Sequence, residues 1–320
     1  MGLHSITALC MAALPMTICA AEDYPSKPVR IVVAAAPGGG TDFVARVMNA
    51  QLSERLGQPV VIDNRGGAGG TVGTEIVAKA PADGYTILMV FVNFAIHPSL
   101  YQKLPYDSVR DFAPLSTLAG TPLVLVVQPQ LAAKSVRELV ALGKIPSSRL
   151  NYAAPGVGSL GHLAGELFKN MTGVDMVHVA YKGGGPAITA VIAGEVQAYF
   201  STMPAALAQV KAGRLRALGV TGIKRVASEP SIPTIAESGV PGYDVTGWFG
   251  AMAPAQTPGV VIARLNRDIV AALAAPEIRE RMAAEGIEPG GSTPEQFSAI
   301  IKSDIAKWTR LVREAKIKPE

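Results

Sequence analysis

The sequence predicts an α/β protein built from two lobes. Short runs rich in Val and Ile alternate with segments of helical periodicity, which is typical of parallel βαβ units with helices on both faces of a sheet. Hydrophobic residues make up 49% of the 320 residues and charged residues only 17%, a composition suited to a well-packed core. Glycine-rich turns follow several predicted strands, and this length favours two domains over one.

The strands are predicted from short β-branched and aromatic runs that are bounded by turn residues. They cover residues 29–35, 60–63, 85–91, 123–127, 150–153, 176–180, 196–200 and 216–220. Helices are predicted between them. An apolar stripe predicts a helix over 43–56, and Ser135 begins another one as a capping box with Glu138. After Pro254 only helical patterns remain, at residues 258–274, 276–285 and 293–316.

No long linker separates the two lobes. We expect lobe 1 to be discontinuous, with residues 22–122 and 249–320, and lobe 2 to comprise residues 123–248. The chain then crosses between the lobes in two strand-like segments, 118–127 and 243–253. Two crossings suit hinge closure around a ligand in the cleft.

Residues 1–21 contain few polar residues and an apolar core, as a secretory signal peptide does, and cleavage is expected near Ala20 or Ala21. Both cysteines of the chain, Cys10 and Cys19, lie within this segment. The mature chain would therefore contain no disulfide, thiolate metal site or cysteine nucleophile. We expect a periplasmic protein.

Charge and composition exclude several classes of function. The net charge is +4, basic residues are scattered and aromatic residues make up only 6%, so no nucleic-acid partner is expected. The histidines beyond the signal peptide, His97, His162 and His178, lack metal-ligand spacing, so no metal site is expected. Later apolar runs are too short to span a membrane. No cofactor is predicted.

The turn at residues 36–42 (APGGGTD) is the clearest candidate site. It lies between the first predicted strand and the first predicted helix. Glycines let backbone N–H groups approach a ligand, and the helix start adds unpaired donors and the positive end of its dipole. The turn therefore predicts a site for a carboxylate or a phosphate. Related turns at residues 64–71, 151–161 and 179–186 suggest a ligand held between lobes.

Residues 156–161 fit the pattern G-x-G-x-x-G, which leaves three interpretations open. One is dinucleotide binding, although no acidic residue ends the next strand. A second is a tight turn without a ligand, and a third is an anion site at which Ser159 offers its hydroxyl and N–H groups. Ser159 is not a hydrolase nucleophile, because Val157 replaces the first glycine of G-x-S-x-G. His162 follows one turn later and has either a cleft-facing or a capping role.

Two further turns have both a structural and a functional interpretation. Asn64 and Arg65 close the second predicted strand, where they either reach a ligand or stabilise the turn. Tyr181 and Lys182 either supply an aromatic wall and a positive charge to the site or lie in a solvated loop.

Several motifs occur in a fixed order along the chain: APGGGTD at 36–42, NRGGAGG at 64–70, DGYT at 83–86, HPSLY at 97–101, AYKG at 180–183, PSIPT at 230–234 and GWFG at 247–250. This ordered set resembles the Bug family, the extracytoplasmic solute receptors of tripartite tricarboxylate transporters. The resemblance covers essentially the whole mature chain. It implies a type II periplasmic-binding-protein fold, two α/β lobes that close on a carboxylated solute, and no catalysed reaction.

The resemblance also implies ligand-binding residues. The first glycine loop and helix start, which hold a ligand carboxylate in the family, correspond to Pro37, Gly38, Gly39, Gly40, Thr41 and Asp42. The contacts from the second lobe correspond to Gly156, Gly158, Ser159, His162, Tyr181 and Lys182. We expect specificity to come from Asn93, Phe94, Phe200, Ser201, Thr202 and Trp248. The implied partners are the membrane subunits of a transporter, and the receptor is expected to be a monomer.

The family often has an aspartate that recognises an amino group, but this chain has Gln197 at that position. We therefore expect a ligand without an ammonium group, such as a dicarboxylate or an aromatic carboxylate. Two other classes of function remain open from the sequence. One is a sensor for a signalling partner. The other is an exported enzyme, for which a titratable pair in the cleft would be needed and no convincing pair is found.

Overall fold

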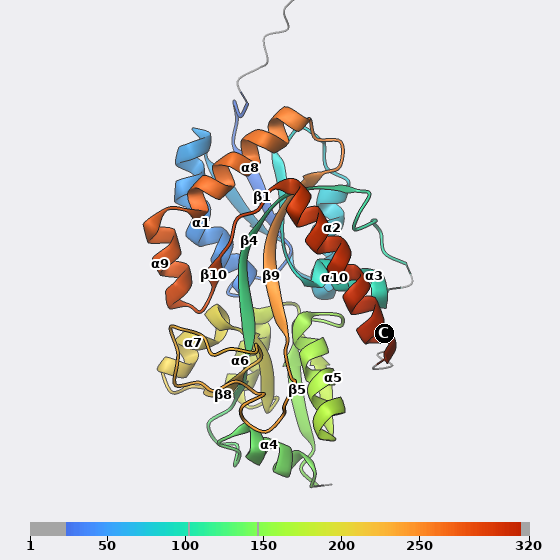
Figure 1. The fold of residues 1–320 in the computed structure, drawn as a ribbon, viewed down its shortest axis with the longest axis vertical. Helices are drawn as coiled ribbons and strands as arrows, with labels where there is room; N and C mark the ends of the chain where they lie inside the picture. Colours follow the sequence, from blue (N-terminus) through green and yellow to red (C-terminus); the bar gives the residue numbers. More distant parts are fainter. Residues whose placement is uncertain (1–23, 102, 146, 315–320) are drawn as a thin grey trace, which may run out of the picture.

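The computed structural model describes residues 24–101, 103–145 and 147–314, and shows the predicted α/β fold (Figure 1). The predicted signal peptide lies outside the described residues. Within the described ranges, no helix combines the length and apolar character that a membrane span requires.

The strands are β1 (Val29–Val33), β2 (Val60–Asn64), β3 (Thr86–Phe91), β4 (Phe112–Val127), β5 (Leu150–Ala154), β6 (Met176–Ala180), β7 (Ala198–Thr202), β8 (Arg216–Val220), β9 (Thr246–Pro254) and β10 (Glu288–Pro289). The helices are α1 (Gly40–Leu56), the short 3-10 turn η1 (Ala68–Gly70), α2 (Thr71–Ala78), α3 (Asn93–Leu100), α4 (Val136–Gly143), α5 (Leu160–Thr172), α6 (Gly184–Ala193), α7 (Met203–Lys211), α8 (Gly259–Leu273), α9 (Pro276–Ala284) and α10 (Pro294–Glu314).

The strands form a ten-stranded sheet with the order β2-β1-β3-β9-β4-β7-β5-β6, and β8 and β10 also pair with β4. β1 runs parallel to β2 and β3, and β5 runs parallel to β6 and β7. The predicted parallel units are thus confirmed on both sides of the sheet. The strands that join them, β9 and β4, are antiparallel to their neighbours, which the alternation of strand and helix did not predict.

β4 and β9 connect the upper and lower parts of the molecule in Figure 1. β4 is 16 residues long, whereas the sequence predicted a strand at 123–127 and a strand-like crossing over 118–127. Up to Pro122 it pairs with β9, and from Leu123 it pairs with β7 and β8. This change of partners falls where the sequence-based boundary between the lobes was placed. The division into two lobes itself stays a prediction.

Side chains of β1 show how the upper part of the sheet is covered. Val29, Ile31 and Val33 pack in a cluster with residues of α1 and α8, while Val32 belongs to the cluster on the opposite face with residues of α2, α3 and α10. Successive residues of a strand point to opposite faces, so a strand with helices on both faces is apolar throughout. This is why the Val and Ile runs predicted strands well.

Two local predictions need correction. Glu288–Pro289 forms a short strand beside β4, in a region where only helices were predicted. The capping box at α4 is also incomplete: the Ser135 hydroxyl accepts a hydrogen bond from the Glu138 N–H at 3.2 Å, but the Glu138 carboxylate accepts from the Lys134 N–H at 2.7 Å rather than from Ser135. The carboxylate therefore accepts from the N–H group of the residue before the cap instead of from the cap itself.

We expect Gly250→Ala in β9 to lower the free energy of unfolding by about 1–3 kcal/mol, as for other overpacked cores. A Cβ atom at Gly250 would overlap the ring of Phe297 on α10, which packs edge-on against Trp248 at 5.0 Å between ring centroids. Urea denaturation measures the loss. The matched control is Gly120→Ala on the neighbouring strand, where a Cβ meets no atom within 4 Å. Equal losses in both variants would contradict the packing argument.

Candidate binding site

A cavity opens where the turns that follow β1, β2, β5 and β6 meet. All four turns stand at the carboxyl ends of parallel strands, which is where ligands collect in open α/β sheets. Among the predicted ligand-binding residues, the cavity is lined by Gly39, Gly40, Thr41, Asn93, Phe94, Lys182 and Thr202. The others do not line it: Pro37, Gly38, Asp42, Gly156, Gly158, Ser159, His162, Tyr181, Phe200, Ser201 and Trp248.

Around the cavity, the turns meet backbone to backbone. A Cβ atom added to Gly156 would lie 2.7 Å from the Gly69 nitrogen, and one added to Gly66 would lie 3.1 Å from the Lys182 carbonyl oxygen. Gly183 also has no room for a side chain, because an added Cβ atom would lie 2.9 Å from the Cβ of Ala36. Glycine at these positions therefore permits the turns of the upper and lower parts to touch.

Two helix N-termini converge on the cavity. α1 begins at Gly40 and α6 begins at Gly184, and neither has a side-chain cap. A Cβ at Gly39 would lie only 3.7 Å from the Gly184 nitrogen. Because the first N–H groups of a helix have no partner within it, both helices direct unpaired donors and positive dipole ends to the same place. This arrangement can hold an anion.

Asp42 stabilises the first turn from within. Its carboxylate accepts hydrogen bonds from the Gly38 N–H at 3.0 Å, from Arg46 Nε at 2.9 Å and from Asn64 Nδ2 at 3.0 Å. Burial alone would raise the pKa of Asp42, but these hydrogen bonds outweigh it and hold the pKa below its ordinary value. The ionised carboxylate is thus already fully engaged, which explains why this residue does not face the cavity.

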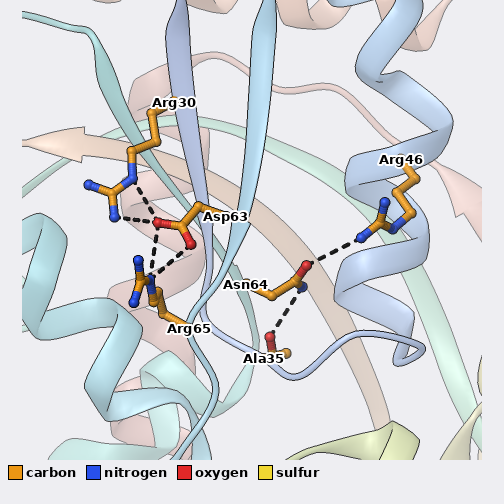
Figure 2. Close-up of polar contacts among 6 residues, drawn as sticks. All are labelled: Arg30, Ala35, Arg46, Asp63, Asn64 and Arg65. Carbon is orange, nitrogen blue, oxygen red and sulfur yellow. Dashed lines mark hydrogen bonds and ion pairs between the residues drawn. The ribbon is translucent and has the colours of Figure 1, made fainter.

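Asn64 and Arg65 have structural partners (Figure 2). Asn64 donates to the Ala35 carbonyl oxygen at 3.2 Å and accepts from Arg46 at 3.3 Å. Arg65 binds the Asp63 carboxylate, which also binds Arg30. Burial alone would raise the pKa of Asp63, but the hydrogen bonds and positive charges of Arg30 and Arg65 outweigh burial and lower it. Neither Asn64 nor Arg65 lines the cavity.

The N-terminus of α5 is occupied by protein groups. The Ser159 hydroxyl, which is fully buried, accepts from the His162 N–H at 3.2 Å, and the Ser159 N–H donates to the Gly156 carbonyl oxygen at 3.3 Å. The Leu160 N–H donates to Asn93 Oδ1 at 2.7 Å. These donors are therefore taken, and the turn offers no comparable set for the pyrophosphate of a dinucleotide.

His162 supports the same turn. Its Nδ1 accepts a hydrogen bond from the Gly158 N–H at 3.2 Å, and its ring stacks on His178 with 4.1 Å between centroids. A nitrogen that accepts a hydrogen bond is unprotonated, so this contact requires the neutral ring. Burial is the main cause that lowers the pKa of His162, to about 4.

Phe200, Ser201 and Trp248 also have partners elsewhere. Phe200 and Ser201 are buried in β7, and the Trp248 indole donates to Asp304 on α10 at 2.6 Å. Gln197, the basis of the expectation about ammonium groups, likewise lies outside the cavity lining, and its side-chain oxygen accepts from the Asn151 N–H at 2.9 Å.

Sequence reasoning missed three polar residues of the cavity wall: Thr74, His97 and Tyr199. Two atoms in the wall are buried without a hydrogen-bond partner, Nε2 of His97 and Oγ1 of Thr202. Buried polar atoms in proteins are nearly always paired, so these two are candidate contacts for a bound molecule. The HPSLY motif contained His97, but nothing in its spacing indicated a cavity.

Comparisons with known proteins agree on one family. Residues 44–317 match the family described as "Tripartite tricarboxylate transporter family receptor". Protein BugT of Bordetella pertussis is 40% identical over 302 residues, which cover 93% of this chain and 93% of BugT.

Two solved structures are similar throughout. The periplasmic binding protein BugD has a TM-score of 0.90 and 34% identity, covering 93% of this chain and 100% of its own. Rpa4515 of R. palustris, solved with adipate, has a TM-score of 0.90 and 37% identity with the same coverage.

The neutral ring of His162 predicts acid sensitivity. Above pH 6.5, the ordinary pKa, its stabilising effect is fully present, and it is lost as the pH falls towards the folded value of about 4, because the unfolded chain then binds the proton more tightly. We expect His162→Asn, whose Oδ1 can still accept from Gly158, to reduce the stability lost between about pH 7 and pH 5 by about 2 kcal/mol. Urea unfolding at both pH values measures this. An unchanged pH dependence would assign the acid sensitivity to other groups.

Proposed function

The chain belongs to the family of tripartite tricarboxylate transporter receptors, and from this membership and the cavity we propose that it captures a small carboxylated solute between its glycine-rich turns. Members of this family are periplasmic solute receptors rather than enzymes, so the resemblance seen in the sequence is confirmed. In our proposal a monomer, freed of its signal peptide near Ala20 or Ala21, delivers the solute to the membrane subunits of a transporter.

The observation that carries this proposal is the electrostatics of the cavity. Among the described residues that line it, Lys182 has the only charged side chain, and no carboxylate faces the ligand space. The N–H groups at the starts of α1 and α6 add to this positive potential. A carboxylate beside Gly40 would also lie next to Thr202 Oγ1, which is within 2.8 Å of an ideal Cβ at Gly40. An ammonium group would find no counter-charge.

Adipate in Rpa4515 supports the same ligand chemistry, because that protein shares the fold and 37% of its residues with this chain. The absence of a lining carboxylate is also a firmer reason to expect a ligand without an ammonium group than the residue at position 197, which does not line the cavity.

We propose that binding closes the two lobes, residues 22–122 with 249–320 and residues 123–248. The described conformation has contacts of the kind a closed state needs. Asn93 on α3 accepts a hydrogen bond from the Leu160 N–H of α5, and the Tyr101 hydroxyl donates to the Val157 carbonyl oxygen at 3.1 Å. Together with the glycine contacts, these bonds hold the upper turns against the lower ones. Opening would separate them and admit solute.

The first test identifies the ligand and then removes the positive charge of Lys182. Native mass spectrometry and thermal shift against mono- and dicarboxylates, aromatic acids and amino acids should give a response to a carboxylate. For that acid, we expect Lys182→Gln to weaken binding about tenfold in calorimetry, the loss of one charge-assisted contact. Lys144→Gln, on an exposed residue at the end of α4, is the control and should retain affinity. A protein that binds no acid in the panel would refute the proposal.

The second test concerns closure. We expect Asn93→Ala to weaken the binding of every accepted acid by a similar factor, about fivefold, because one hydrogen bond of the closed state is lost. X-ray scattering should show a larger radius for the variant at equal ligand concentration. Asn266→Ala is the matched control, since its amide bonds only Leu115 and Ser292 oxygens within the upper part. A loss confined to one acid would show instead that Asn93 contacts the ligand.

A further inference from the structure

Besides the helix starts, the imidazole of His97 on α3 also lines the cavity. The side chain is 1% exposed and lines the cavity, and its Nε2 has no hydrogen-bond partner. The Nε2 edge of the ring faces two glycines: a Cβ at Gly69 would lie 3.2 Å from Nε2, and one at Gly158 would lie 3.7 Å from Cδ2. The backbone of Gly69 is near but makes no hydrogen bond of normal geometry with this nitrogen.

The other ring nitrogen has a hydrogen-bond partner. Nδ1 of His97 lies 2.9 Å from the hydroxyl of Tyr106, and burial raises the pKa of Tyr106, so the phenol retains its proton. The hydroxyl of Tyr106 can donate to Nδ1 or accept from it, and we assign it the donor role, which leaves the ring proton on Nε2. The free edge of His97 is then an N–H donor at the cavity wall. A ligand oxygen would complete its hydrogen bonding.

The surroundings keep this donor uncharged. Aromatic rings enclose it: Tyr101 stands edge-on to His97 at 5.5 Å, and Phe94 stacks parallel to Tyr106 at 6.3 Å. Burial lowers the pKa of His97 to about 4, with a smaller opposing effect from the backbone of Gly69. Lys182, the one cation of the described cavity lining, lies in the turn after β6. An ionised carboxylate at His97 would therefore lose its water without gaining a counter-charge.

We infer that His97 Nε2 donates a hydrogen bond to a neutral oxygen of the ligand, a hydroxyl or a carbonyl group, and that the preferred solute is a monocarboxylate carrying such a group. This inference rests on the proposed function, since the carboxylate of the same ligand would occupy the starts of α1 and α6. A preference for such a monocarboxylate would distinguish this receptor in ligand specificity from Rpa4515, which was solved with a dicarboxylate, adipate.

The test compares matched sets of straight-chain acids of equal length: the plain monocarboxylate, its ω-hydroxy derivative and the dicarboxylate. Calorimetry on the wild-type protein should show the hydroxy acid binding about tenfold or more tighter than the plain acid, because the plain acid leaves the buried N–H unpaired. It should also bind tighter than the dicarboxylate. Repeating the titrations in Bis-Tris and Tris, two buffers that are not anions, measures proton uptake, which should be close to zero for the hydroxy acid.

Variants of His97 test whether this residue is the cause. His97→Gln retains an N–H donor near the position of Nε2 and should still favour the hydroxy acid over the plain acid. His97→Leu should lose that preference. Thermal unfolding without ligand checks that both variants fold. Nitrogen NMR of the imidazole provides a measurement that needs no stable variant: the Nε2 proton should be observable at neutral pH and should shift when the hydroxy acid binds.

The outcomes separate the two proposals. If no acid binds, the proposed function fails. If acids bind but the plain and hydroxy acids bind equally, His97 does not contact the ligand and this inference fails while the receptor function stands. Tighter binding of the dicarboxylate with uptake of about one proton would show that His97 becomes charged, which would also overturn it.

Discussion

The direct contact between glycine backbones is the constraint on which the rest of the structure depends. The turns of the upper and lower parts approach so closely that a side chain at Gly156, Gly183 or Gly185 would overlap the opposing turn. With side chains excluded from this seam, backbone N–H groups and helix dipoles contribute to the polarity near the α1 start. Such a site recognises charge and shape well. It has few groups that could transfer protons, which suits a receptor.

Much of the fold could be predicted because its strands are covered on both faces and therefore stand out as apolar runs. β6 and β8 have the predicted bounds. The first half of β4 was missed because Pro114, Ser116 and Thr117 interrupt its pattern, and the structure absorbs them in register shifts against β9. Strand direction was also beyond prediction, since an apolar run has the same composition whether its neighbour is parallel or antiparallel.

The residues of the candidate site could be predicted where they lie next to one another in the sequence. Gly39, Gly40 and Thr41 line the cavity because one turn places them there, whereas His97 and Tyr199 come from a helix and a strand that only tertiary packing brings together. Asp42 and Ser159 show the opposite error. Their types suit a ligand contact, yet both are engaged at their own helix starts. A capping side chain and a ligand-binding one have the same sequence signature.

The paired strands β4 and β9 have a consequence for the thermodynamics of capture. The two parts of the molecule are joined by continuous, mutually hydrogen-bonded strands rather than by flexible segments. A disordered linker would lose backbone entropy whenever closure fixed it, at about 1–2 kcal/mol per residue. In the closure proposed above, strands that stay paired would avoid most of this loss. The contacts formed around the solute would then contribute more fully to affinity, because they would not have to offset the ordering of a linker.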